Sequence, residues 1–202
     1  MAQLCSTMKA YLLGIFAALL FAGDVNAQHA NFGIKGGFNM YTFNDGNKTN
    51  YGGRAGFHVG ALAHFHLADE FGLQPEVVFS TQGASYSGTS SSTYFSLNYI
   101  NVPVLFQYMF NMGFRIEAGP QLGILLSAKS ETGGVKSDVK NNFKPIDFGV
   151  AIGASYVHVP TGFGVDARLN LGVTQISAIS SSPNTWNQGL QLGVFYLFGH
   201  KS

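Results

Sequence analysis

The sequence predicts an all-β protein, an eight-stranded antiparallel up-and-down transmembrane β-barrel preceded by a cleavable signal peptide. Three observations predict this fold class. After residue 28, apolar and polar residues alternate over stretches of roughly ten residues, and no stretch keeps a helical period. Short and long connections between these stretches alternate along the chain. An apolar run near the N-terminus is too short to cross a membrane as a helix.

The N-terminal segment has the organisation of a secretory leader. Residues 10–22 form an uncharged apolar run behind Lys9, and Val25-Asn26-Ala27 follows it. A membrane-spanning helix needs about 20 apolar residues, whereas a shorter run with small residues at a cleavage site is typical of a signal peptide. We therefore expect a signal peptide over 1–27 and a barrel domain over 28–202. An uncleaved anchor helix is the alternative, and translation could start at Met1 or at Met8.

Composition excludes several classes of protein. The 202 residues are 46% hydrophobic, so the chain is too apolar to stay disordered. Lys and Arg number 11 against 10 Asp and Glu, a balance that argues against nucleic-acid binding by a basic surface. The only cysteine, Cys5, lies in the leader, so the mature chain would have no disulfide, thiol nucleophile or cysteine metal site.

Each predicted strand has one apolar and one polar face. In the clearest stretch, Phe57 and Val59 belong to the apolar face, whereas Arg54 and His58 belong to the polar one. The apolar faces contain no Lys, Arg, Asp or Glu, which predicts lipid outside and a polar packed interior. A soluble barrel with the opposite polarity is the alternative. In chain order the eight stretches are 32–40, 54–66, 73–80, 100–110, 114–126, 146–155, 165–173 and 190–198.

The connections set the expected orientation in the membrane. Short periplasmic turns and longer outer loops are typical of bacterial outer-membrane barrels, so we expect localisation in the cell outer membrane. The short connections are 67–71, 111–113 and 159–162, and the long ones are 42–52, 86–97, 128–144 and 176–188. Aromatic girdles are expected from Tyr41, Tyr51, Tyr86, Tyr99 and Trp186 near the long loops, and from Phe71, Phe110, Phe114, Phe163 and Phe198 near the short turns.

A set of short motifs resembles a known family. The motifs are Phe32-Gly33-Ile34-Lys35-Gly36-Gly37-Phe38-Asn39, Leu73-Gln74-Pro75-Glu76, Ile100-Asn101-Val102-Pro103, Ile116-Glu117-Ala118-Gly119-Pro120 and Asp147-Phe148-Gly149. Together and in this order they resemble PorT-like outer-membrane β-barrel proteins of Bacteroidetes-type Gram-negative bacteria. The resemblance implies the eight-stranded barrel and the outer membrane, and it implies little chemistry. The namesake's link to secretion and gliding is not transferred to this chain.

Eight charged residues fall on the predicted interior faces: Lys35, Arg54, Glu76, Arg115, Glu117, Asp147, Asp166 and Arg168. A proton or ion relay is one interpretation. The other is a structural network of salt bridges, because eight strands leave a lumen just wide enough to be filled by side chains. The balance of four charges of each sign favours the structural network, with each carboxylate bridged by Lys or Arg and no open pore.

No residue set indicates catalysis, a cofactor or a metal. His64 and His66 lie two apart on one face, but no third ligand has a telling spacing. A lipid-modifying enzyme would need His and Ser near the outer leaflet, whereas His200-Lys201-Ser202 lies at the expected periplasmic end. We expect a monomer with a structural role or an interaction with a protein or surface partner through the outer loops, surrounded by outer-membrane lipid. A lipid-modifying enzyme, a narrow channel or transporter, and a secretion-apparatus component are the alternatives.

Overall fold

The computed structural model describes residues 30–46, 49–88, 92–179 and 183–198. The chain divides into two compact units, residues 1–30 and residues 31–202, and the description that follows concerns the second. The expected signal peptide over 1–27 and its cleavage site lie outside the described residues. Within the described part of the chain, no helix has the length and apolar character required to traverse a membrane.

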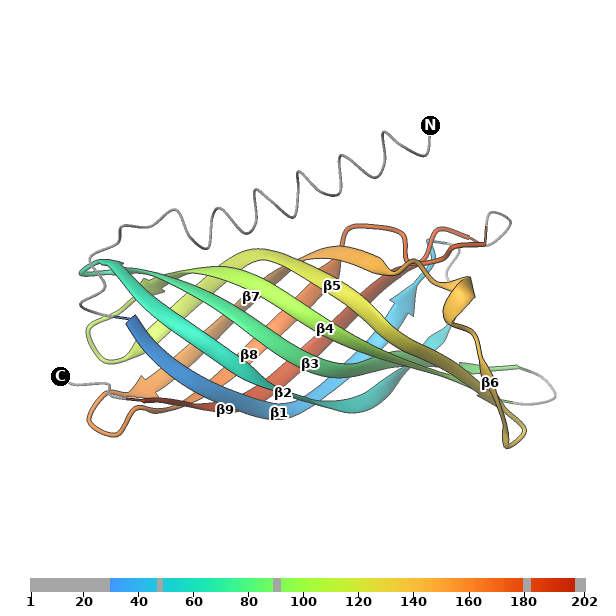
Figure 1. Ribbon diagram of the computed structural model, residues 1–202, viewed down its shortest axis with the longest axis horizontal. Helices are drawn as coiled ribbons and strands as arrows, with labels where there is room; N and C mark the ends of the chain where they lie inside the picture. The colour runs from blue at the N-terminus through green and yellow to red at the C-terminus, as the bar shows by residue number, and fades with distance from the viewer. Residues whose placement is uncertain (1–29, 47–48, 89–91, 180–182, 199–202) are drawn as a thin grey trace. The chain divides into compact units, whose positions relative to one another are not determined.

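Eight long antiparallel strands pair with their neighbours in sequence and close into a barrel, as the sequence predicts (Figure 1). The ring closes where β1 pairs with β9, with Gly33 opposite Leu197. A short strand, β6 (Val135–Asp138), pairs with β5 alone among the described strands and lies outside the ring. The strands of the ring are β1 (Ala30–Asn44), β2 (Tyr51–Ala68), β3 (Phe71–Ser87), β4 (Ser92–Met109), β5 (Phe114–Thr132), β7 (Ile146–His158), β8 (Phe163–Gly172) and β9 (Trp186–Leu197).

The short connections are tight turns at one end of the barrel. Asp69 and Glu70 alone join β2 to β3. Two of the turns require glycine, because Gly113 (φ 83°) and Gly162 (φ 73°) have backbone angles that side chains disfavour. Gly113 donates a backbone hydrogen bond to the Phe110 carbonyl at 3.1 Å, which closes the turn between β4 and β5. β1 begins and β9 ends at this same end of the barrel.

Side chains alternate between the outside and the interior of the barrel as the sequence predicts. Outward Phe38 is 79% exposed and outward Phe106 is 60% exposed, although both are fully apolar. Inward Lys35, Glu76 and Arg168 are buried. An apolar surface of this kind is stable against lipid, and the closed ring leaves no backbone edge to satisfy there.

The long connections of the sequence prediction are wrong in part, because two of them are largely strand. β4 begins at Ser92, and β5 continues to Thr132 before the chain returns as β6. A 3-10 turn (η2, Lys140–Asn142) follows. The segment predicted as loop 86–97 is therefore mostly an extension of the barrel wall, apart from residues 89–91, which lie outside the described residues. In the segment predicted as loop 128–144, residues 128–132 extend the wall as the end of β5, and Val135–Asp138 form β6 outside the ring.

These strand ends were predicted as loops because their outward side chains are polar and their inward side chains apolar, the reverse of the pattern in the rest of the barrel wall. On this part of β4 the inward side chains are Leu97 and Tyr99, both buried, whereas outward Ser96 and Asn98 are polar. Apolar inside and polar outside is the pattern of a barrel wall in water. From Leu126 to Thr132, β5 extends roughly 20 Å at about 3.3 Å per residue beyond its last outward apolar side chain.

The predicted aromatic girdle is confirmed at the short-turn end but not for the tyrosines at the other end. Phe71 and Phe163 at the short-turn end are exposed. At the other end Tyr51 packs against buried apolar residues, with its ring centroid 5.7 Å from that of Phe43, and the Tyr86 ring centroid lies 5.9 Å from that of Tyr51. Tyr41 and Tyr99 are buried in the interior instead, so their assignment to a girdle is wrong. The reason is strand periodicity, since each of these tyrosines has the same parity as the inward polar residues of its own strand.

Candidate functional site: a closed barrel interior

Five of the eight predicted interior charges form one ion-paired group in the middle of the barrel. We call it the Arg168 network, and its members are Lys35, Glu76, Glu117, Asp166 and Arg168. Arg168 Nη1 lies 2.9 Å from Glu76 Oε2, and Arg168 Nη2 lies 2.6 Å from Glu117 Oε1. Lys35 Nζ lies 3.3 Å from Glu76 Oε2 and 3.1 Å from Asp166 Oδ2.

Two glutamines extend the network into a hydrogen-bonded ring that crosses the lumen. Gln74 Nε2 donates to Glu76 Oε1 at 2.8 Å. Gln107 Nε2 donates to Gln74 Oε1 at 3.1 Å and to Glu117 Oε2 at 2.7 Å. Arg168 closes the ring between the two glutamates, so β3, β4, β5 and β8 are joined by side chains across the interior. Neither glutamine was predicted as a member of the network, although the alternation of side chains along β3 and β4 places both on the inward face.

The remaining three predicted charges do not join the ion pairs among the described residues, and the expectation that they would is wrong. Arg115 is buried, but the residues opposite it are Met109 on β4 and Ser155 on β7, neither of which carries a charge. Arg54 Nη1 donates to the Phe95 carbonyl at 2.8 Å.

Asp147, the third of these charges, is half-buried on β7. Its Oδ1 accepts a hydrogen bond from Thr174 Oγ1 at 2.8 Å. Arg54 and Asp147 thus bond to groups outside the Arg168 network, and Arg115 lies two residues from Glu117 on β5 without an ion pair to it.

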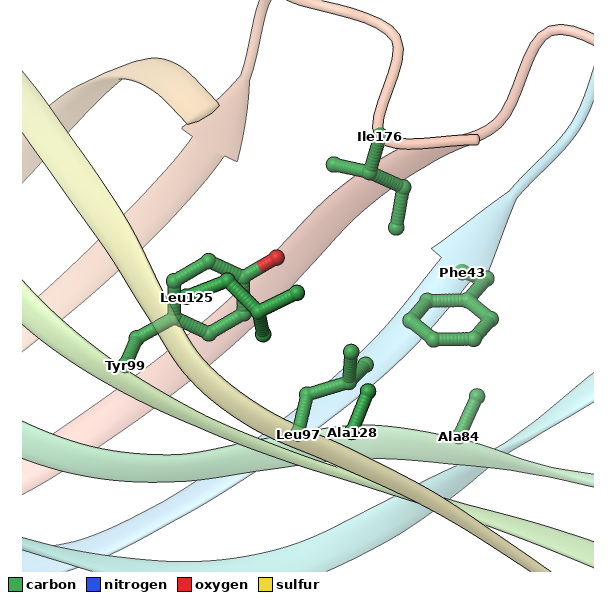
Figure 2. Close-up of a cluster of buried hydrophobic side chains, with 7 residues drawn as sticks. All are labelled: Phe43, Ala84, Leu97, Tyr99, Leu125, Ala128 and Ile176. Atoms are coloured by element: carbon green, nitrogen blue, oxygen red, sulfur yellow. The ribbon is translucent and has the colours of Figure 1, made fainter. Parts of the chain in front are cut away.

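An apolar cluster fills the lumen on the outer side of the Arg168 network (Figure 2). This outer apolar cluster consists of Phe43, Ala84, Leu97, Tyr99, Leu125, Ala128 and Ile176. Phe95 and Phe143 pack against it, with ring centroids 5.9 Å and 6.2 Å from that of Phe43. Ile176 comes from the connection between β8 and β9, and its carbonyl accepts a hydrogen bond from the Lys144 N–H at 2.7 Å. The outer connections thus fold over the barrel mouth and are held there by buried side chains.

A second apolar cluster lies toward the short-turn end. This short-turn apolar cluster contains Leu62, Val157, Phe195 and Leu197. The Phe195 ring lies directly over Gly164, where any Cβ would collide with it, so the glycine allows the ring to fill the lumen. The interior is therefore layered, with charges in the middle and packed apolar side chains on both sides. The sequence prediction of a charged interior missed both apolar layers.

Two histidines are buried in the described part of the barrel, and neither belongs to a group of described residues that could hold a metal ion. His64 is buried and its ring centroid lies 4.6 Å from that of His66, in an edge-to-face arrangement. His58 is also buried, against Gly37 and Gly193. Over the described ranges of the chain, no three His, Cys, Asp or Glu side chains gather closely enough to hold a metal ion.

The fold, its outward apolar band and its closed polar interior define a transmembrane β-barrel of the bacterial outer-membrane type. Residues 26–178 match the family described as "Outer membrane protein beta-barrel domain", so the chain belongs to that family. The protein is an outer-membrane β-barrel protein located in the cell outer membrane. No curated protein matches the chain.

Solved structures share this fold. Neisserial surface protein A (NspA) is 19% identical over 84% of this chain and 99% of its own, with a TM-score of 0.59. Ail of Yersinia pestis, in complex with the heparin analogue sucrose octasulfate, is 16% identical over 85% of this chain and 100% of its own, with a TM-score of 0.51. At these identities the similarity extends to the fold.

Proposed function

We propose that this protein is a PorT-like outer-membrane barrel with no open pore, and that its role is structural or an interaction through its outer segments rather than catalysis. The observation that carries the proposal is the layered interior, in which the Arg168 network lies between two packed apolar clusters. A lumen filled in this way leaves no continuous aqueous path. The mature domain would comprise residues 28–202 after removal of the leader over 1–27, and it would act as a monomer.

The interior charges serve stability in this proposal. The three buried carboxylates of the Arg168 network face two cations, so each carboxylate has a positive neighbour within 3.3 Å. Buried charges that are paired and hydrogen-bonded avoid the large desolvation cost of isolated ones. The predicted group of eight charges then divides into these five ion-paired residues and three that are held separately.

An anionic surface partner is the interaction that the outer segments support best. The segment 129–144 carries four exposed lysines, Lys129, Lys136, Lys140 and Lys144, against the two acidic residues Glu131 and Asp138. Lys136 lies 3.7 Å from Glu131, which leaves an excess of positive charge on the segment. Ail, which shares the fold, was crystallised with a heparin analogue, and a polyanion is the matching chemistry for these lysines.

Planar-bilayer recordings on the purified protein test the closed lumen. We expect no stable single-channel steps, and steady, reproducible conductance would overturn the proposal of a closed lumen.

Calorimetric titration of the protein with sucrose octasulfate tests the proposed polyanion partner. The affinity for sucrose octasulfate should fall in the triple variant Lys136→Gln/Lys140→Gln/Lys144→Gln. It should stay unchanged in the control double variant Asn141→Gln/Asn142→Gln, which alters the same segment without removing charge. Equal affinities in the two variants would exclude the lysines as the binding surface.

A further inference from the structure

A groove lies on the outside of the barrel, away from the interior and from the outer lysines. Its volume is about 430 Å³, and it crosses β2, β1, β9 and β8. Small-molecule sites in proteins span roughly 300–1,000 Å³, so the groove is large enough to hold part of a ligand. Its lining is mostly apolar, with Met40, Leu169, Leu171 and Leu190 among its residues.

The groove lining includes two small residues on neighbouring strands, Thr42 on β1 and Gly53 on β2. Met40 pairs with Leu190, and Thr42 pairs with Gln188 one step further toward the outer end. On the next strand Gly53 has no side chain, and a Cβ there would lie 3.1 Å from Met40 Cγ. Thr42 Oγ1 donates to the Tyr51 carbonyl at 3.1 Å, which ties β1 to β2 beside this depression.

The chemistry of the groove changes along the barrel axis. Met40 and Leu190 are exposed apolar side chains that continue the lipid-facing band of the barrel. One step outward, Thr42 and Gln188 bring a hydroxyl and an amide. Just beyond the lining residues, Trp186 pairs with Asn44, and tryptophan is a residue type enriched at membrane surfaces.

We propose that this groove binds one acyl chain of an outer-leaflet lipid, with the lipid's polar end beside Thr42, Gln188 and Trp186. The occupant follows from continuity with the lipid-facing surface, since the apolar part of the groove opens directly onto that surface. The order of the side chains, from apolar to amide to indole, matches the order of groups along a lipid near the membrane surface. The site is independent of the polyanion surface proposed for segment 129–144.

The chain provides its own probe, because Trp186 is its single tryptophan. The protein is reconstituted in vesicles of phosphatidylcholine brominated on both acyl chains, which quenches Trp186 fluorescence by contact. Unbrominated lipid A is then added as competitor. If the groove binds it, fluorescence recovers roughly threefold more than the mole fraction of lipid A predicts, since a preferred lipid displaces the quencher from the site.

Gly53→Leu fills the groove, and the matched control Ala55→Leu adds the same side chain on the same outward face of β2 outside the lining residues. The excess recovery should disappear in Gly53→Leu and remain in Ala55→Leu. Thr42→Leu fills the groove from β1 and serves in case Gly53→Leu does not insert. Recovery that follows the mole fraction in the wild type, or that is equal in the filled and control variants, would overturn the proposal. Recovery that grows with protein density and vanishes in a monomeric fraction would assign the groove to a second copy of the chain instead.

Discussion

Replacing Arg168 with Met should strongly destabilise the barrel. The guanidinium makes four hydrogen bonds, two to Glu117 Oε1 and one to each carboxylate oxygen of Glu76. After its loss Glu76 keeps Lys35 and Gln74, whereas Glu117 keeps the hydrogen bond from Gln107 and the electrostatic attraction of Arg115, to which it makes no ion pair. Breaking a buried pair by removing one partner costs about 3–5 kcal/mol, because the remaining charge is left uncompensated.

The free energy of unfolding is measured by urea titration of the protein refolded in lipid vesicles, with Trp186 fluorescence as the signal. The second change Glu117→Gln, made in the Arg168→Met background, should recover much of the loss because it removes the uncompensated carboxylate. Lys136→Gln is the control, since it breaks an exposed pair whose atoms are 3.7 Å apart, and it should change stability little. If Arg168→Met costs no more than Lys136→Gln, or if Glu117→Gln brings no recovery, the reasoning about the network fails.

Three further predictions test the membrane orientation, the outer layer and the leader. Val59→Arg on the lipid-facing surface should cost roughly 2–4 kcal/mol in the same titration, whereas Ser137→Arg on β6 should cost little; equal tolerance would contradict the orientation. Leu97→Ala in the outer apolar cluster should cost about 2–5 kcal/mol through the cavity it leaves, and a cost close to zero would mean that the cluster is not packed. N-terminal sequencing of the membrane-extracted protein should begin at Gln28, and a protein that retains Met1 or Met8 would refute the leader.

Local patterns were sufficient to predict the barrel and the inward or outward direction of most side chains. A strand turns successive side chains to opposite faces, so the direction of Lys35 or Phe38 follows from its neighbours in the chain. The same rule, applied consistently, would also have placed Tyr41 and Tyr99 in the interior. It failed to detect the outer ends of β4 and β5, because strand recognition relied on apolar residues facing lipid, and there the outward residues face water.

The pairing of the interior charges could be decided only by the tertiary structure. Glu76 and Arg168 are 92 residues apart in the chain, and the contact between Arg168 and Glu117 spans 51 residues. Strand tilt and stagger determine which inward side chains reach the same level of the lumen. They bring Arg168 between two glutamates and place Arg115 opposite the uncharged Met109 and Ser155, although the sequence presents both as inward arginines on charged strand faces. The sequence by itself determined which residues face the interior, since that depends on local backbone geometry; the closed barrel decided which of them meet, since that depends on how distant strands are staggered.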